Sequence, residues 1–237
     1  MSRETNYVVG DFVHCIKRGA FGLEIFRDES DYWRFFRLLY LCNDEYIDSN
    51  VSKIEQTSDM FSRPSHWPPR KTLCDIVSFV AMPNHFHLLL REHREGGIGK
   101  FMQRLSGSIS MGFNAKYNNN GTIFQGKYKP VPIKNDSHLY YLIPYINVKN
   151  VFELYPHGGI AGAYEHFDDA FKWAQTYPFS SFSALVHGEK LGMISGTALE
   201  FLDLPISAER LPKYKEYAKE IIEYYVQKKK HRHDGSE

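Results

Sequence analysis

Two apolar segments joined by a Pro-Asn dipeptide constrain the fold of this chain more than any other feature of the sequence. Residues 73–82 (LCDIVSFVAM) and 85–93 (HFHLLLREH) are rich in β-branched, aromatic and leucine side chains. Pro83 and Asn84 stand between them as a turn signal. We therefore predict two β-strands separated by a tight turn.

Before and after this pair, the sequence predicts elements of both types. A strand is predicted over residues 7–19, and a helix over 27–47 with Asp28 or Ser30 as its N-cap. A second helix is predicted over 97–118, where four apolar residues recur at four-residue steps: Phe101, Leu105, Ile109 and Phe113.

The second half of the chain begins with a basic segment and continues into helices. Residues 122–134 (TIFQGKYKPVPIK) read as an extended ribbon, and a helix follows over 135–152 with Asp136 or Ser137 as its N-cap. A compact connector (177–188) and a final helix from about residue 207 to 230 close the chain.

The order of these elements predicts an α+β fold, in which an antiparallel sheet is backed by helices and followed by a C-terminal helical extension. We predict one domain over residues 1–186 and an extension with a basic tail over 187–237. The first domain contains a polar insertion of more than twenty residues at about 48–70, which has no periodicity. Loops of that length tend to be functional or disordered.

Composition narrows the class of protein. With 43% hydrophobic and 15% aromatic residues, the 237-residue chain is globular rather than disordered. No apolar run approaches the about 20 residues of a membrane helix, and the polar N-terminus is no signal peptide. Three cysteines without a CxxC pattern fit a reducing compartment, so we predict a cytoplasmic protein with no membrane partner. The net charge of +1 neither demands nor excludes nucleic acid.

The second strand of the pair carries two histidines, His85 and His87. On a strand, side chains two residues apart share a face, so both imidazoles point the same way while Phe86 points opposite. Two neutral imidazoles side by side can bind a divalent metal. The alternative is structural, with one histidine buried in the core and the other facing solvent.

The motifs around this pair form an ordered series. MPNHFHLLL is followed by FQGKYK, then PYINVKN, then YPFSSF, and the N-terminal VHCIKRG precedes them all. This series resembles the single-tyrosine HUH transposases, in particular the REP-associated tyrosine transposases, and the resemblance extends from about residue 8 to about 186. It implies a ferredoxin- or RRM-like HUH core.

The resemblance also implies an activity. A metal-dependent endonuclease and strand transferase would act on single-stranded DNA that carries a hairpin, through a 5′-phosphotyrosine intermediate. His85 and His87 would hold one Mg²⁺ or Mn²⁺ that polarises the scissile phosphate. Tyr145 matches the family nucleophile because it heads the Tyr-Ile pair of that motif, whereas Tyr140 and Tyr141 are expected to pack the helix against the sheet.

Two residues depart from the family pattern. The family carries Asn or Gln four residues after the nucleophile, where it completes the metal shell, but Lys149 stands there and Asn150 follows it. Either Asn150 takes over through a shifted helix, or metal binding is weaker, or Lys149 instead favours the phenolate of Tyr145 and contacts the phosphate. Pro144 precedes the nucleophile and cannot donate a helix hydrogen bond, so we predict a kink there or a later helix start.

Further polar residues are candidates for DNA binding. His14 matches a histidine of the family's first strand, and it either supports the phosphate or is a buried structural residue. Gln125 lies in the FQGKYK block, and Lys127 and Lys129 are predicted to alternate onto one face of the ribbon. Together with Lys134 they form a candidate phosphate track. The alternative is a solvated edge strand protected by lysines.

Two other classes of function fit the same residues. The first is a catalytically inactive relative that binds structured single-stranded DNA or RNA as a regulator, for which Lys149 and Pro144 argue. The second is a metal-dependent phosphodiesterase without a covalent intermediate. The chain is expected to act as a monomer or a homodimer.

Overall fold

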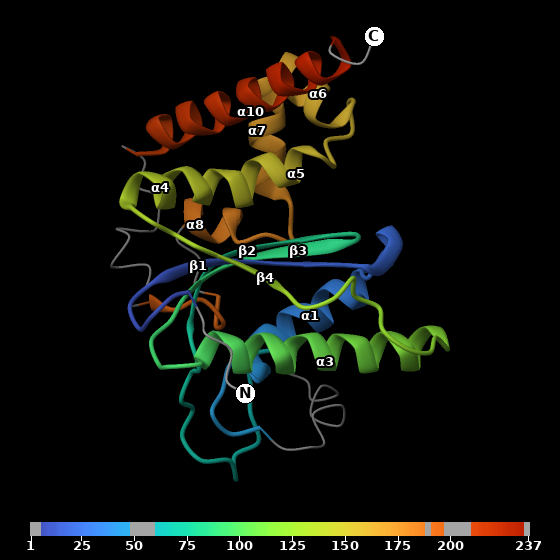
Figure 1. Cartoon of the computed structure of the whole chain (residues 1–237), viewed down its shortest axis with the longest axis vertical. Helices are drawn as coiled ribbons and strands as arrows, with labels where there is room; N and C mark the ends of the chain where they lie inside the picture. The colour runs from blue at the N-terminus through green and yellow to red at the C-terminus, as the bar shows by residue number, and fades with distance from the viewer. Residues whose placement is uncertain (1–5, 48–59, 188–190, 197–209, 235–237) are drawn as a thin grey trace. The chain divides into compact units, whose positions relative to one another are not determined.

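The computed structural model describes residues 6–47, 60–187, 191–196 and 210–234 of the chain (Figure 1). Two compact units are present. The sheet unit comprises Met1–Val77, Ala81–Ile133 and Leu191–Ala198. The helical unit comprises Ser78–Val80, Lys134–Lys190 and Leu199–Glu237. The predicted division at residue 186 stays a prediction.

A four-stranded antiparallel sheet organises the first unit (Figure 1). Its strands run in the order β2-β3-β1-β4. Their bounds are β1 Phe12–Arg18, β2 Asp75–Met82, β3 His85–Arg91 and β4 Lys129–Pro132. The predicted pair of strands around the Pro-Asn turn is confirmed, since β2 and β3 are hydrogen-bonded neighbours separated by two residues. The antiparallel sheet of the predicted α+β fold is confirmed as well.

The ribbon predicted over residues 122–134 is mostly irregular, and its regular part is the short strand β4 at the edge of the sheet. It pairs with β1 from Val13 opposite Pro132 to Ile16 opposite Lys129. Pro130 and Pro132 have no backbone N–H, so this strand cannot donate a full ladder of hydrogen bonds to a further strand. The two prolines thus suit β4 to an edge position.

Two helices cover one face of the sheet (Figure 1). Helix α1 (Glu29–Cys42) begins at a capping box, because the Asp28 side chain accepts from the backbone of Asp31 and the Asp31 side chain reciprocates. Helix α3 (Gly97–Tyr117) buries the four apolar residues predicted at four-residue steps. The short 3₁₀ turn η1 (Ala20–Gly22) connects β1 to α1.

The predicted insertion at about 48–70 falls partly outside the described residues, which resume at residue 60. The part that is described is anchored to the end of α1. The Arg63 guanidinium lies 2.7 Å from the buried Asp44 carboxylate. The buried Asn43 side chain accepts hydrogen bonds from the backbone N–H groups of Leu73 (3.0 Å) and Cys74 (3.1 Å). Residues 60–74 are therefore held by buried polar contacts.

Among the described residues, the helical unit contains one helix broken by a π-turn and four others. The broken helix comprises α4 (Asp136–Pro144), the π-turn η2 (Tyr145–Lys149) and α5 (Asn150–Phe152). The others are α6 (Gly159–Glu165), α7 (Phe167–Thr176), α8 (Phe182–His187) and α10 (Leu211–Asp234). Helix α10 confirms the predicted C-terminal helix and packs against α4, η2 and α6 (Figure 1).

Three local predictions in this unit were wrong or incomplete. The N-cap of α4 is Asn135, whose side chain accepts from the His138 N–H, and not Asp136 or Ser137. Helices α6 and α7 were not predicted. The connector predicted over 177–188 contains α8. In the described part of the chain, no helix is both long enough and apolar enough to span a bilayer.

Candidate active site

Strand β3 brings the two predicted metal ligands onto one face of the sheet. His85 and His87 have ring centroids 5.0 Å apart, and each is 4% exposed. Phe86 points to the other face, where its ring lies 5.0 Å from that of Phe35 on α1. The alternating placement predicted for the pair is therefore confirmed. The alternative in which one histidine faces solvent is wrong, since both are buried.

Each of these histidines is oriented through its Nδ1 atom. His85 Nδ1 lies 2.6 Å from the Asn84 Oδ1 atom, which can only accept, so the imidazole donates. His87 Nδ1 lies 2.7 Å from His14 Nε2. Metal-binding histidines in proteins almost always engage their second nitrogen in this way, because the partner sets the tautomer and the ring orientation. In His85 the Nε2 atom is then suited to ligate a metal, and in His87 it is so in the tautomer in which Nδ1 donates to His14.

His14 belongs to this arrangement although it lies on another strand. In the register of β1 and β3 it stands opposite Leu89, so His87 is its diagonal neighbour on the same face. The rings of His14 and His87 stack with centroids 5.0 Å apart, and His14 is 6% exposed. His14 is thus a buried partner of a candidate ligand.

The donors in this cluster limit which metal shell can form. Among the described residues, no group of three or more His, Cys, Asp or Glu side chains could hold a metal ion. The two imidazoles by themselves offer a metal two nitrogen ligands and leave its other positions open to oxygen donors such as water or phosphate. Such an open shell fits a catalytic Mg²⁺ or Mn²⁺ rather than a closed structural zinc site.

The candidate nucleophile lies on a π-turn in the helical unit. Helix α4 begins at Asp136 and includes Pro144 as its last residue, so the predicted later helix start is wrong. The backbone stays helical from Pro144 into Tyr145, and the predicted kink stays a prediction. From Tyr145 the chain follows the wider π-helical pattern, and the Asn150 N–H donates to the Tyr145 carbonyl five residues back. Consequently Asn150, and not Lys149, is the residue bonded one turn above Tyr145.

Lys149 nevertheless stays close to Tyr145. Its Nζ atom lies 5.2 Å from the centroid of the Tyr145 ring and 2.5 Å from Glu153 Oε1. It also approaches Asn150 Oδ1 at 3.5 Å. The Lys149 side chain is 7% exposed, so its charge is balanced mainly by the carboxylate of Glu153.

The neighbouring tyrosines on α4 do not have the packing role predicted for them. Tyr140 is 49% exposed and Tyr141 is 39% exposed, whereas Tyr145 is half-buried. A side chain exposed to that extent does not form part of a core.

Asn147, in the middle of the π-turn, anchors it to other elements of the same unit. Its Oδ1 atom lies 3.0 Å from both the Ser78 hydroxyl and the Ser181 hydroxyl, which donate to it. Ser181 in turn accepts from the Phe79 N–H at 3.0 Å. Asn147 is fully buried, so this network is shielded from water. It fixes the turn to Ser78–Val80 and to the segment before α8, both of which belong to the helical unit.

The candidate DNA-binding residues of the ribbon are exposed. Gln125, Lys127, Lys129 and Lys134 all face solvent. Lys129 begins β4, but Lys127 lies in a bend before it, so the predicted alternation of the two lysines on one strand face is not formed.

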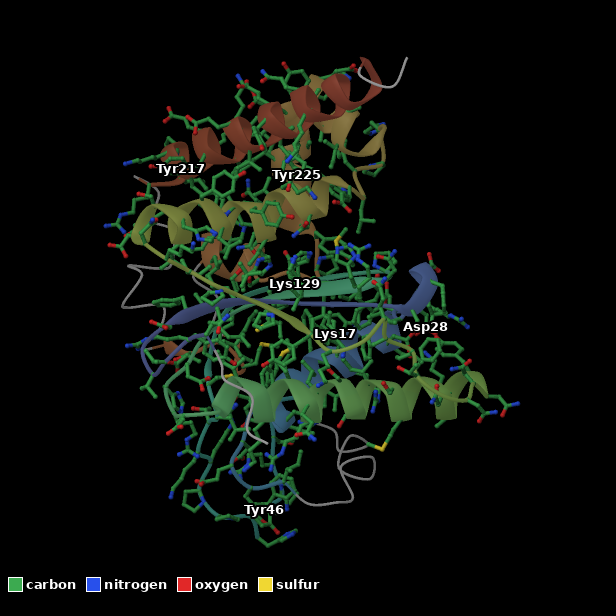
Figure 2. The ribbon with its side chains drawn as sticks, viewed as in Figure 1. Lys17, Asp28, Tyr46, Lys129, Tyr217 and Tyr225 are labelled. Atoms are coloured by element: carbon green, nitrogen blue, oxygen red, sulfur yellow. The ribbon has the colours of Figure 1, made fainter. Side chains whose placement is uncertain are left out.

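One lysine near the ribbon was missed in the sequence. Lys17 on β1 is buried, donates to the Gly126 carbonyl at 2.6 Å and lies over the Phe124 ring (Figure 2). Burial lowers the pKa of its ammonium group.

Comparison with known proteins agrees with this arrangement of motifs. Residues 69–149, which include both histidines and Tyr145, match the family described as IS200-like transposases. The resemblance to the HUH transposase superfamily inferred from the motifs is thereby confirmed. No curated protein matches the chain.

A solved structure of a REP-associated tyrosine transposase bound to a REP hairpin is similar in outline. The similarity covers 83% of this chain and 92% of that one, with 15% sequence identity and a TM-score of 0.40. At that level the likeness carries no conclusion about activity.

Several residues of the candidate site have little or no signal in the sequence. Asn84, Asn147 and Ser181 lie within the quoted motifs, so the resemblance pointed to their segments without assigning them a role. Asn147 and Glu153 acquire their roles through contacts that depend on the π-turn and on the packing of the helical unit.

Proposed function

We propose that this protein is a metal-dependent single-strand DNA endonuclease and strand transferase that acts on hairpin-containing DNA. The observation that carries the proposal is the pair of buried histidines, each oriented through Nδ1, within a segment that matches IS200-like transposases. The activity would be cytoplasmic, with single-stranded DNA as the partner and a monomer or homodimer as the working form.

In the proposed reaction, the Tyr145 hydroxyl oxygen attacks the scissile phosphorus. The phosphorus–O3′ bond breaks, a 5′-phosphotyrosine forms, the phenol proton passes to solvent, and the leaving oxygen takes up a proton as a free 3′-hydroxyl. The number of phosphodiester-type bonds is unchanged, so a later hydroxyl can reverse the step and join strands. A bound Mg²⁺ or Mn²⁺ would supply Lewis-acid polarisation of the phosphate oxygens. His85 and His87 would hold it.

Asn150 is the proposed third protein ligand. The family spacing of four residues is lengthened here to five, and the π-turn takes up the extra residue, since the Asn150 N–H bonds to the Tyr145 carbonyl. Its amide oxygen is a hard donor suited to Mg²⁺ or Mn²⁺, unlike the ammonium of Lys149. Lys149, Gln125, Lys127, Lys129 and Lys134 are proposed phosphate contacts, and His14 supports His87.

Covalent capture tests this function. The full-length protein is incubated with a pool of single-stranded hairpin DNAs and Mn²⁺, denatured, and digested, and DNA-adducted peptides are mapped by mass spectrometry. We expect an adduct on Tyr145 that is absent with chelator and absent in Tyr145→Phe. The matched control is Tyr140→Phe on α4, an exposed tyrosine whose loss should leave the adduct unchanged. Cleavage that persists in Tyr145→Phe would instead indicate a phosphodiesterase without a covalent intermediate.

A second function is favoured by one contact. The Lys149–Glu153 ion pair beside the Tyr145 ring occupies the helix position where the family has a metal ligand. A relative that lost metal binding in this way would bind hairpin DNA or RNA as a regulator. Hairpin binding that survives chelator, together with an adduct that forms in Lys149→Asn but not in the natural protein, would establish this alternative.

A further inference from the structure

The C-terminal helix places a second tyrosine against the candidate nucleophile. Tyr225 of α10 lies with its ring centroid 5.9 Å from that of Tyr145, and the two side chains are hydrogen-bonded. Helix α10 packs against the π-turn that carries Tyr145, and Figure 2 shows Tyr225 on the side of α10 that faces this helix. Both residues belong to the helical unit. Tyr225 is therefore a built-in neighbour of the candidate nucleophile.

The same lysine contacts both aromatic rings. Lys149 Nζ lies 4.6 Å from the Tyr225 centroid and 5.2 Å from the Tyr145 centroid. A cation over the faces of two rings is attracted to both. Glu153 holds this ammonium from the other side, at 2.5 Å. Lys149 of η2, Glu153 at the C-cap of α5 and Tyr225 of α10 thus form a cluster beside the Tyr145 side chain.

The raised pKa of Tyr225 suits its hydroxyl to donate a hydrogen bond to Tyr145. Burial, and then the hydrogen bond to Tyr145, raise the pKa of the Tyr225 phenol to about 12, whereas Lys149 acts to lower it. A hydrogen bond raises the pKa of the group that donates it, because it stabilises the protonated form. Tyr225 therefore keeps its proton at neutral pH, and its hydroxyl is able to donate to the oxygen of Tyr145.

We propose that Tyr225 is a positioning residue for the nucleophile, whose hydroxyl holds the Tyr145 oxygen and stabilises the negative charge that develops there during attack on phosphorus. This inference rests on the proposed nuclease function and deepens it. Tyr225 keeps its proton and forms no bond to DNA. It makes the C-terminal helix a part of the catalytic unit rather than an appended tail.

The surroundings of Tyr225 provide a matched control. Tyr224, the next residue, is 53% exposed, and its ring lies 6.0 Å from that of Tyr225. Lys228 donates to the Tyr224 hydroxyl at 3.4 Å. Substituting Tyr224 by phenylalanine removes a hydroxyl from the same helix, one residue away, and leaves the contact between Tyr145 and Tyr225 in place.

The experiment combines a spectroscopic readout with a kinetic one on the full-length protein. 3-Fluorotyrosine is placed at position 145 and its ¹⁹F resonance is recorded in the otherwise natural chain, in Tyr225→Phe and in Tyr224→Phe. In unlabelled protein, the single-turnover rate of adduct formation and the half-saturating concentration of a hairpin DNA are measured with Mn²⁺.

We expect Tyr225→Phe to move the ¹⁹F resonance and to slow adduct formation by about ten- to a hundredfold, the loss typical of a hydrogen bond to a charged group. The half-saturating DNA concentration should stay the same, and Tyr224→Phe should change none of the three quantities. A role in packing alone would leave the rate unchanged, because phenylalanine keeps the ring.

Two contrary results are distinguishable. Equal adduct rates in Tyr225→Phe and the natural protein, or an unmoved ¹⁹F resonance, would overturn the inference while leaving the nuclease intact. A natural protein that forms no adduct on Tyr145 with the hairpin pool, although the resonance moves in Tyr225→Phe, would overturn the proposed nuclease and with it the catalytic role of Tyr225.

Discussion

Replacing Asn147 by alanine should loosen the helical unit around the π-turn. The side chain is fully buried, and its amide oxygen accepts from Ser78 and Ser181, each at 3.0 Å. The substitution removes both hydrogen bonds, which are worth about 1 kcal/mol each in net stability. It does not strand the two hydroxyls, because they lie 3.0 Å apart and Ser181 also reaches the Phe79 carbonyl at 3.3 Å.

We therefore expect a loss of about 2 kcal/mol in the free energy of unfolding, at the low end of the range for a broken buried network. For a chain of this size, that loss corresponds to a melting temperature lower by about 4–8 °C. Ser181→Ala combined with Asn147→Ala should show a coupling energy of about 1 kcal/mol, since the two side chains share a hydrogen bond.

Urea unfolding followed by circular dichroism measures these quantities. Asn120→Ala is the matched control, because Asn120 is exposed in the loop after α3 and its loss should change stability by less than about 0.5 kcal/mol. A change in Asn147→Ala no larger than that of the control would refute the reasoning, and the network would then have no part in holding the π-turn.

Three further predictions concern metal, DNA and acid. His14→Ala should weaken Mn²⁺ binding about ten- to a hundredfold, because it removes the partner that orients His87. The control is His66→Ala, an exposed histidine whose loss should leave the affinity unchanged. Equal Mn²⁺ affinities of His14→Ala and the natural protein in titration calorimetry would contradict this role. Lys129→Gln should lower the slope of log affinity against log salt for single-stranded DNA by about 0.7, and an unchanged slope would remove Lys129 from the phosphate track. Hydrogen bonds from Lys116 and then from Ser30 hold the pKa of Asp28 well below its usual 3.8. The ionised carboxylate therefore stabilises the fold above about pH 4, and this stabilisation is lost as the pH falls further. Asp28→Asn should therefore be less stable than the natural protein at pH 7 and lose less on acidification; parallel pH–stability curves would refute this.

Much of the sheet unit could be predicted from the sequence because its signals are local. The apolar runs over 73–82 and 85–93 with Pro-Asn between them leave few alternatives to two neighbouring strands. The four-residue spacing from Phe101 to Phe113 specifies which side of α3 is buried. Asp28 followed three residues later by Asp31 is a local N-cap signal that needs no tertiary contact.

The elements that were missed depend on contacts between distant residues. Helices α6 and α7 are short, and a helix of seven to ten residues is stabilised mainly by packing rather than by its own propensity. The N-cap of α4 is Asn135 rather than Asp136. Neighbouring polar residues are equally good N-cap candidates in the sequence, and the backbone path into the helix decides which of them caps it.

The candidate site also has features that the sequence predicts and features that depend on long-range contacts. The pairing of His85 with His87 on one face follows from the period of a strand, so spacing alone predicts it. The partner of His87 is His14, 73 residues earlier, and this contact exists only after β1 and β3 pair in register. Burial of both rings likewise requires the assembled fold.

The sequence by itself determined the central strand pair, the buried face of α3 and the two histidines side by side. Each of these follows from backbone geometry or from residue spacing within a few positions. Only the tertiary structure decided that the helix becomes a π-turn after Pro144, that Asn150 thereby stands one turn above Tyr145, and that the ring of Tyr225 on α10 lies 5.9 Å from that of Tyr145. The physical reason is that hydrogen-bond register and long-range pairing depend on the packing of the whole unit, which no local pattern encodes.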